Sequence, residues 1–198
     1  MDMKFSFFAL ISRMKNITRW SLMRNNTKEN IQEHSHMAAV IAHALAVIRR
    51  DIFGQPSDPG LAASLALFHD SSEIFTGDMP TPIKYYDAEI MEAYKRVETV
   101  AYRKLLSALP NELRPAYKEI LTPKDDEEML VLVKAADRIS AYIKCVEELK
   151  AGNHEFYHAA NQSKEKLLKM NVPEVIYFYE NFIPAFELTL DELDFSFD

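Results

Sequence analysis

The sequence has few of the residues that mark several common classes of protein. Its single cysteine, Cys145, excludes a disulfide within the chain, and the apolar neighbours of Cys145 predict a buried, reduced thiol. Only four glycines occur in 198 residues, which argues against the turn-rich hairpins of an all-β fold. Alanine, leucine, methionine, glutamate and lysine are abundant instead, so the composition favours helices.

Positive charge and long apolar runs are also scarce. The 23 basic residues are outnumbered by 30 acidic ones, and the formal net charge is -7. No cluster of lysine and arginine is present, so binding to a nucleic-acid polymer is not expected. The apolar segment 5–11 is too short to span a bilayer and has no small-residue cleavage site after it. We therefore expect no membrane association and a cytoplasmic location.

What the sequence does contain is a series of helical patterns. The hydrophobic share of 48% and the charged share of 27% are ordinary for a globular protein. The length suits one domain, residues 1–198, with an acidic tail at 191–198 that is expected to fray. No stretch alternates with a period of two for long enough to predict a sheet. The expected fold is all-α with about seven or eight helices, at residues 5–17, 31–50, 61–75, 88–108, 111–121, 125–150, 154–169 and 173–188.

Local signals predict where some of these helices begin and end. Asn30 can cap the second helix, with Glu33 as the reciprocal partner of a capping box. The acidic cluster 125–128 belongs at a helix N-terminus, where negative charge meets the positive end of the helix dipole. Pro184 is expected to kink or break the last helix.

The third helix carries the most conspicuous polar residues. Predicted over residues 61–75, it would place His69 and Glu73 on one face, about one turn apart. Gly77 suits the left-handed position that ends a helix. Pro80 and Pro82 follow, and two prolines two residues apart predict a stiff, extended segment.

Four potential metal ligands fall in three separate helical segments: His34, His69, Asp70 and Asp137. Two imidazoles and two carboxylates suit a divalent first-row ion such as Mn, Co, Fe or Zn. The two aspartates would neutralise its charge, and octahedral coordination would leave positions open for water and substrate, as at catalytic sites. Small residues beside Asp137 would let its helix approach the others closely.

Each of these residues also has a structural alternative when it is taken alone. His34 could face solvent on a helix surface, and Glu73 could do the same. Arg19 could cover a helix end with its aliphatic stem, and Trp20 could belong to the core. An aspartate such as Asp137, in a helix of small and apolar residues, is harder to explain without a partner.

Longer motifs surround the four ligands. Residues 18–25 are TRWSLMRN, residues 68–73 are FHDSSE, residues 76–85 are TGDMPTPIKY and residues 134–137 are KAAD. The order His…His-Asp…Asp resembles the signature of HD-domain metal-dependent phosphohydrolases. The wider pattern, which extends over nearly the whole chain, resembles the bacterial 5′-deoxynucleotidases within that class.

The resemblance implies an activity, a cofactor and an assembly. The activity is hydrolysis of 2′-deoxynucleoside 5′-monophosphates to deoxynucleoside and phosphate. The cofactor is one divalent transition-metal ion, Co, Mn or similar, bound by His34, His69, Asp70 and Asp137. The assembly is a homodimer. The aromatic-rich stretch 176–186 could provide an apolar surface for it, although burial in the core would explain that stretch equally well.

The resemblance also implies roles for individual residues in the site. Glu73 is the candidate for proton transfer near the metal, and Arg19 would counter charge on the phosphoryl oxygens. Asp78 would bind the sugar 3′-hydroxyl or orient the attacking water. Trp20 would pack against the deoxyribose, where a 2′-hydroxyl would clash or lose its hydrogen bonds. The segment that follows Asp78 would line the nucleotide pocket with four residues: Thr81, Pro82, Ile83 and Lys84.

Two other functions stay open at this point. The chain could be another HD-domain phosphohydrolase, acting on phosphodiesters or nucleoside triphosphates. It could instead be a catalytically silent helical module that binds a nucleotide or a partner. The presence of Glu73, Asp78 and Arg19 alongside all four ligands argues against the silent module.

Overall fold

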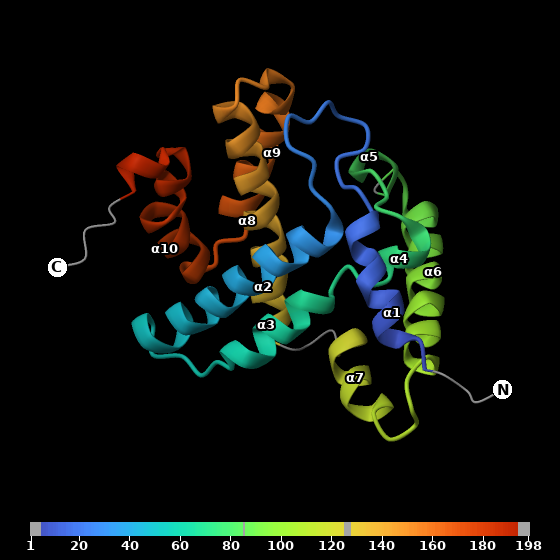
Figure 1. Ribbon diagram of the computed structural model, residues 1–198. Coiled ribbons are helices and arrows are strands. Elements are labelled where there is room, and N and C mark those ends of the chain that lie inside the picture. Colours follow the sequence, from blue (N-terminus) through green and yellow to red (C-terminus); the bar gives the residue numbers. More distant parts are fainter. Residues whose placement is uncertain (1–4, 85, 125–127, 194–198) are drawn as a thin grey trace.

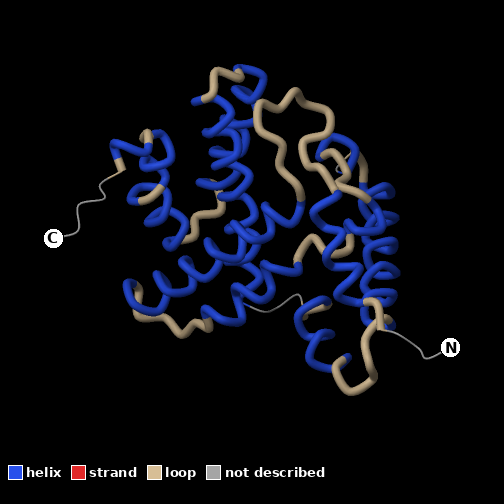
Figure 2. Tube along the Cα trace, viewed as in Figure 1, coloured by secondary structure: helices blue, strands red, loops and turns tan. Residues whose placement is uncertain are grey.

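The computed structural model describes residues 5–84, 86–124 and 128–193, with only the backbone of Thr81. Within these ranges the regular elements are helical, apart from an isolated antiparallel bridge between Thr18 and Asn30 (Figure 2). The all-α prediction is confirmed. Seven long helices are present, and α1 (Phe7–Ile11) continues into the 3₁₀ turn η1 (Ser12–Asn16) as an eighth. The seven are α2 (Ile31–Val47), α3 (Pro59–Phe68), α6 (Ala88–Ser107), α7 (Arg114–Leu121), α8 (Glu128–Lys150), α9 (Tyr157–Leu168) and α10 (Pro173–Asn181).

Short helical turns connect or extend these helices. Two of them, α4 (Glu73–Thr76) and α5 (Thr81–Lys84), lie between α3 and α6. The others are η2 (Ile48–Ile52), η3 (His154–Phe156), η4 (Ile183–Glu187) and η5 (Leu190–Glu192). The last predicted helix, 173–188, is broken as expected, since α10 ends before Pro184 and η4 follows.

The predicted capping box at the start of α2 is confirmed. The Asn30 side chain accepts hydrogen bonds from the backbone N–H groups of Gln32 and Glu33, each at 3.0 Å. The Glu33 carboxylate in turn accepts one from the Asn30 backbone at 3.1 Å. Together they satisfy N–H groups that have no partner inside the helix. The acidic cluster predicted to begin α8 lies outside the described residues, except for Glu128.

The main core forms where α2 packs against α3 and α8 (Figure 1). Fully buried small residues on these helices let their backbones approach closely: Ala38, Ala42, Ala46, Ala62, Ala66, Ala135 and Ala136. The same core includes Cys145, where burial raises the thiol pKa to about 12. A second, smaller apolar cluster joins α1, α6 and the segment that leads through α7. Close packing of α2, α3 and α8 therefore brings together the three segments that carry the predicted ligands.

The aromatic-rich stretch 176–186 is partly core and partly surface. Phe178 and Ile183 are buried in the main core, whereas Phe182 is 45% exposed. The core therefore takes part of the stretch and leaves part exposed, and its use as a dimer surface stays a prediction. Among the described residues, no helix has the length and hydrophobicity needed to cross a membrane.

The third predicted helix, residues 61–75, is wrong in its second half. The helix α3 ends at Phe68, and the chain makes successive tight turns before α4 begins at Glu73. The carbonyl of Ala66, which would accept from residue 70 in a continuing helix, accepts from the His69 ring at 2.6 Å. A side chain that bonds to the local backbone in this way competes with the helix. His69 and Glu73 therefore do not share one continuous helical face.

The extended segment predicted at residues 78–84 is wrong in its second half. Residues Thr81–Lys84 form the single helical turn α5. Pro82 is the second residue of that turn, where a backbone N–H has no helical acceptor to lose. The proline pair therefore begins a helix here rather than preventing one.

Candidate active site

The four predicted metal ligands converge on one point. Nε2 of His34 lies 3.0 Å from Oδ1 of Asp137 and 3.6 Å from Oδ2 of Asp70. Nε2 of His69 lies 3.2 Å from Oδ2 of Asp70 and 3.9 Å from Oδ1 of Asp137. Ligand atoms of His34, His69 and Asp70 all lie within 4.8 Å of one another. Side chains from α2, α8 and the turn after α3 thus form one cluster that could hold a metal ion.

Nδ1 of each of the two histidines has a hydrogen-bond partner outside the cluster. Nδ1 of His69 is 2.6 Å from the carbonyl oxygen of Ala66, which can only accept, so this nitrogen carries the hydrogen. Nδ1 of His34 is 3.1 Å from Oγ of Ser140, on the same helix as Asp137. Such partners orient metal-binding histidines and leave Nε2 for the ion.

Nε2 of His69, the ring nitrogen near the two carboxylates, indicates whether the cluster fits a cation. It is buried and has no hydrogen-bond partner within the part of the chain that the structure describes. In the neutral ring its lone pair faces the carboxylate oxygens of Asp70 and Asp137, and two buried acceptors that face each other are unfavourable. A positive charge between them, a proton or a metal ion, removes this conflict. The donor set of two imidazoles and two carboxylates fits a divalent transition metal.

The electrostatics of the cluster also favour a cation. Burial would raise the pKa of Asp70, but the neighbouring imidazole of His69 outweighs it and lowers that pKa to about 2. The pKa of Asp137 is likewise lowered, because its interactions with His34 and His69 outweigh burial. Burial would lower the pKa of His69, yet the two carboxylates raise it. The carboxylates are therefore ionised and stabilise positive charge at their centre.

Glu73, the first residue of α4, lies beside this cluster and is buried. Only 5% of the residue is exposed, and its Oε2 has no hydrogen-bond partner among the described residues. Burial, with the carboxylates of Asp70 and Asp78 adding to it, raises the pKa of Glu73 to about 9. A carboxyl group in this state keeps its proton at neutral pH and can donate it.

Arg19 lies among four carboxylates. Burial would lower the pKa of its guanidinium, but Glu29 and the aspartates of the site together raise it. The pKa of Asp78, which follows Gly77 at the end of α4, is raised by burial although Arg19 opposes the shift. Arg19 therefore supplies a fixed positive charge beside the ligand cluster.

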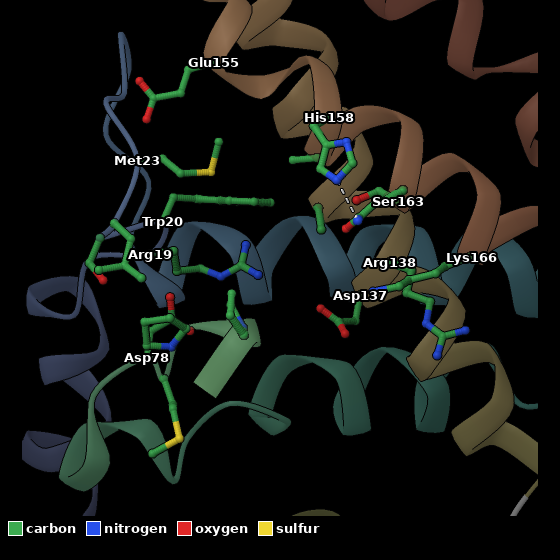
Figure 3. A pocket seen from close by; sticks show the side chains of 18 residues that line it. Arg19, Trp20, Met23, Asp78, Asp137, Arg138, Glu155, His158, Ser163 and Lys166 are labelled. Atoms are coloured by element: carbon green, nitrogen blue, oxygen red, sulfur yellow. Dashed lines mark hydrogen bonds between the residues drawn. The ribbon is translucent and has the colours of Figure 1, made fainter. Parts of the chain in front are cut away.

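A cavity of about 570 Å³ opens from the cluster at Asp137. Figure 3 shows Arg19, Trp20 and Asp78 on one side and Asp137, Arg138 and His158 on the other. This volume is within the usual range for small-molecule sites. The helix α9 closes the far side with polar side chains: His158, Gln162, Ser163 and Lys166.

Some of the predicted substrate residues line this cavity and others do not. Arg19, Trp20, Asp78 and Pro82 are lining residues. Ile83 and Lys84 are not, and Nζ of Lys84 lies 3.5 Å from the Glu98 carboxylate instead. The side chain of Thr81 is outside what the structure describes. The pocket roles of these last three residues stay predictions.

Several functional candidates have no counterpart in the sequence prediction. Ser140 follows Asp137 by three residues, so helical spacing alone would have placed both on one face. Glu29 has no such signal, because its partners depend on how the loop before α2 folds. The polar residues of α9 likewise come to the cavity only through tertiary packing.

Comparison with solved structures identifies the fold. An HD-domain phosphohydrolase from Listeria innocua superposes with a TM-score of 0.79, covering 91% of this chain and 88% of that one at 24% identity. The HD phosphohydrolase DatZ of cyanophage S-2L, determined with dA and one catalytic Zn²⁺ ion, gives a TM-score of 0.65, covering 92% of this chain and 99% of that one at 22% identity. The fold is therefore that of the HD-domain phosphohydrolases.

Comparison of sequences identifies the family. The model of the family "5′-deoxynucleotidase YfbR-like" matches residues 6–186. A 5′-deoxynucleotidase of Vibrio cholerae is 49% identical over 188 residues, which cover 94% of this chain and 97% of that protein. A 5′-deoxynucleotidase of Erwinia tasmaniensis is 46% identical, covering 94% of this chain and 95% of that protein. The chain belongs to the YfbR-like 5′-deoxynucleotidase family, whose enzymes dephosphorylate deoxynucleoside monophosphates, and the resemblance stated from the motifs is confirmed.

Proposed function

We propose that this enzyme hydrolyses 2′-deoxynucleoside 5′-monophosphates with one divalent transition-metal ion, Co, Mn or similar, bound by His34, His69, Asp70 and Asp137. The observation that supports this most directly is the buried Nε2 of His69, which has no hydrogen-bond partner among the described residues and faces two ionised carboxylates. When bound, such an ion acts as a Lewis acid toward a phosphoryl oxygen and makes water a better nucleophile.

Arg19 is proposed to bind the phosphate. One of its nitrogens, Nη1, donates to Glu29 at 2.8 Å, and a guanidinium has further N–H donors for a second partner. Its position between Glu29 and the metal ligands puts a delocalised positive charge where charge develops on the transferred phosphoryl group. Loss of Arg19 should therefore lower kcat as well as weaken binding.

Glu73 is proposed to handle the proton of the reaction. Hydrolysis of a phosphate monoester leaves an alkoxide on the sugar unless a proton reaches the departing 5′-oxygen. Glu73 is buried, its pKa is raised to about 9, and it is close enough to Asp70 and Asp78 for their charges to affect it. It is therefore suited to act as the general acid.

Asp78 and Trp20 are proposed to bind the sugar. Both line the same side of the cavity, and the Trp20 backbone is close enough to Asp78 to lower the pKa of its carboxyl against the larger effect of burial. Asp78 can accept from the 3′-hydroxyl or orient water, and either role uses its carboxylate oxygens. The flat indole of Trp20 beside the sugar would leave no room or partner for a 2′-hydroxyl.

A substrate panel with controlled metal content tests the proposal. Protein stripped with a chelator should release no phosphate from dAMP, and addition of Co or Mn should restore release. The loaded enzyme should act on dAMP far better than on AMP, dATP or a phosphodiester. Full activity after complete chelation would exclude the metal role, and activity confined to diesters would exclude the substrate. The homodimer, the cytoplasmic location and the single domain 1–198 stay predictions.

A further inference from the structure

One carboxylate oxygen, Oε2 of Glu29, contacts two of the side chains with which the loop before α2 lines the cavity. It accepts a hydrogen bond from Nη1 of Arg19 at 2.8 Å and another from Nε1 of Trp20 at 3.0 Å. The Glu29 side chain is only 15% exposed. Arg19 and Trp20 also lie against each other, with the guanidinium carbon 5.8 Å from the centre of the indole (Figure 3).

The backbone ties Glu29 to the same segment. The N–H of Arg19 donates to the carbonyl of Glu29 at 2.9 Å, next to the bridge between Thr18 and Asn30. Glu29 therefore approaches Arg19 from a rigid position just before α2, the helix that carries His34. A carboxylate fixed in this way can fix its two donors.

Trp20 needs such a support because its backbone is in an unfavourable conformation. Its φ angle is +58°, in the left-handed region that a bulky residue rarely adopts. The indole packs against Phe156 in a tilted arrangement, with ring centres 5.3 Å apart, and the ring N–H donates to Glu29. These two contacts hold the indole at the cavity wall.

We propose that Glu29 is a positioning residue that couples the phosphate end of the site to the sugar end. It does not line the cavity, and it acts through Arg19 and Trp20. Because both donors share one oxygen atom, displacement of either one disturbs the other. Glu29 therefore sets the alignment of the phosphate and the preference for deoxyribose over ribose together. The inference rests on the substrate roles proposed above for Arg19 and Trp20.

A simpler alternative is that Glu29 only neutralises part of the charge of Arg19. The two accounts predict opposite results for Glu29→Gln, which keeps the shape, removes the negative charge and so weakens the hydrogen bonds from both donors. Loss of the Glu29 charge alone would make the electrostatic potential around Arg19 more positive. KM for an anionic substrate would then fall while kcat stayed the same. Loss of positioning would lower kcat and the preference for deoxyribose without lowering KM.

The first experiment reads Trp20 directly and needs no substrate. Trp20 is the single tryptophan of the chain, so its fluorescence reports on this site alone. In Glu29→Gln we expect a shifted emission maximum and easier quenching by acrylamide, while Glu112→Gln, an exposed change of the same kind, matches the wild type. An unchanged emission spectrum and unchanged quenching in folded Glu29→Gln would overturn the proposal.

The second experiment compares dAMP and AMP as substrates of the metal-loaded enzyme. We expect kcat for dAMP in Glu29→Gln to fall about 10- to 100-fold, because displacing a reacting group by up to about 1 Å typically causes a loss of this size. The ratio of kcat/KM for dAMP over AMP should fall with it. A lower melting temperature with both kinetic quantities unchanged would assign Glu29 a merely structural role and overturn the inference.

Combined and single variants separate this inference from the proposed function. If Glu29 acts through its two donors, Glu29→Gln should cost little further in a background of Arg19→Lys with Trp20→Phe. If Arg19→Ala alone keeps full activity, the proposed function fails at Arg19. If Arg19→Ala is impaired and Glu29→Gln is not, only the positioning role fails. Should Glu29→Gln not fold, Glu29→Asp keeps the negative charge and shortens the side chain by one methylene. Charge neutralisation alone then predicts wild-type kinetics, and positioning predicts the losses of kcat and of deoxyribose preference.

Discussion

Nε2 of His34 lies 3.0 Å from Oδ1 of Asp137, although the two residues are 103 positions apart in the chain. The contact joins α2 to α8, whose facing surfaces are rich in fully buried alanines. Ser140, on α8 as well, holds the other nitrogen of the same ring. The packing of two helices thus sets both the position and the orientation of a predicted metal ligand.

Removal of the Asp137 carboxylate should abolish metal binding. In Asp137→Asn the ligand cluster loses one of its two negative charges, so we expect the purified protein to contain little metal and to release phosphate from dAMP at least about 100-fold more slowly, a typical loss for a metal that no longer activates water. Elemental analysis and a phosphate assay measure the two effects. Asp51→Asn, at an exposed ion pair with Arg50, is the matched control and should behave as wild type. A fully metallated, fully active Asp137→Asn protein would remove Asp137 from the ligand set.

Ser140 should affect metal affinity without touching the metal. Its hydroxyl fixes the His34 ring through Nδ1, and loss of such a partner typically weakens metal binding about 10- to 100-fold. Titration of the stripped Ser140→Ala protein with Co or Mn, followed by calorimetry, measures this. Ser107→Ala, which removes an exposed hydroxyl, should leave the affinity unchanged. Equal affinities for wild type and Ser140→Ala would show that the ring is held without this hydrogen bond.

The sequence predicts the fold, and the clustering of the four candidate ligands, for physical reasons. Helical periodicity and caps such as Asn30 are local, and the structure confirms them. The four candidates could be selected because their residue types and motif context are specific, although their distances could not be derived. The sequence failed where a side chain redirects the backbone, as the His69 ring does at the Ala66 carbonyl and as Pro82 does at the start of α5.

The residues that the sequence did not reveal are those whose role depends on tertiary contacts. Glu29 is one of 30 acidic residues in an acidic chain, and only the fold of the loop brings it to Arg19 and Trp20. Glu73 was selected from the sequence, but the cause of its raised pKa is burial, which spacing does not reveal. Patterns thus identify the residue types of a site, and packing determines their chemistry.

If Glu73 is the general acid, the fall in kcat caused by replacing it should depend on the leaving group of the substrate. Glu73→Gln keeps the shape but has no transferable proton, so kcat for dAMP should fall by about 10²- to 10⁴-fold. p-Nitrophenyl phosphate, whose leaving group needs no proton, should be affected much less. Glu112→Gln is the control for loss of a carboxylate. Equal losses on both substrates would mean that Glu73 acts on the attacking water rather than on the leaving oxygen.

Glu148 should make the stability of the fold depend on pH in acid. This buried carboxylate accepts hydrogen bonds from the backbone N–H groups of Asn26 and Thr27 and from the side chains of Asn153 and Lys144. It thereby anchors the loop that carries Arg19 and Trp20 to α8. Burial would raise the pKa of Glu148, but these hydrogen bonds lower it to about 2.

The direction of the pH effect follows from that lowered pKa. Above the ordinary value of 4.5 the carboxylate is ionised in both the folded and the unfolded chain, so its full contribution is present. As the pH falls from about 4.5 toward 2, the unfolded chain takes up the proton first, and the contribution, roughly 3 kcal/mol at 1.36 kcal/mol per pKa unit, is lost.

Urea unfolding of wild type and Glu148→Gln at pH 7 and pH 3 measures this contribution of Glu148 to the free energy of unfolding. The gap in unfolding free energy between the two proteins should narrow at pH 3, whereas the gap between wild type and Glu112→Gln should stay near zero. A gap for Glu148→Gln that is the same at both pH values would mean that the ionised form is not what the hydrogen bonds stabilise.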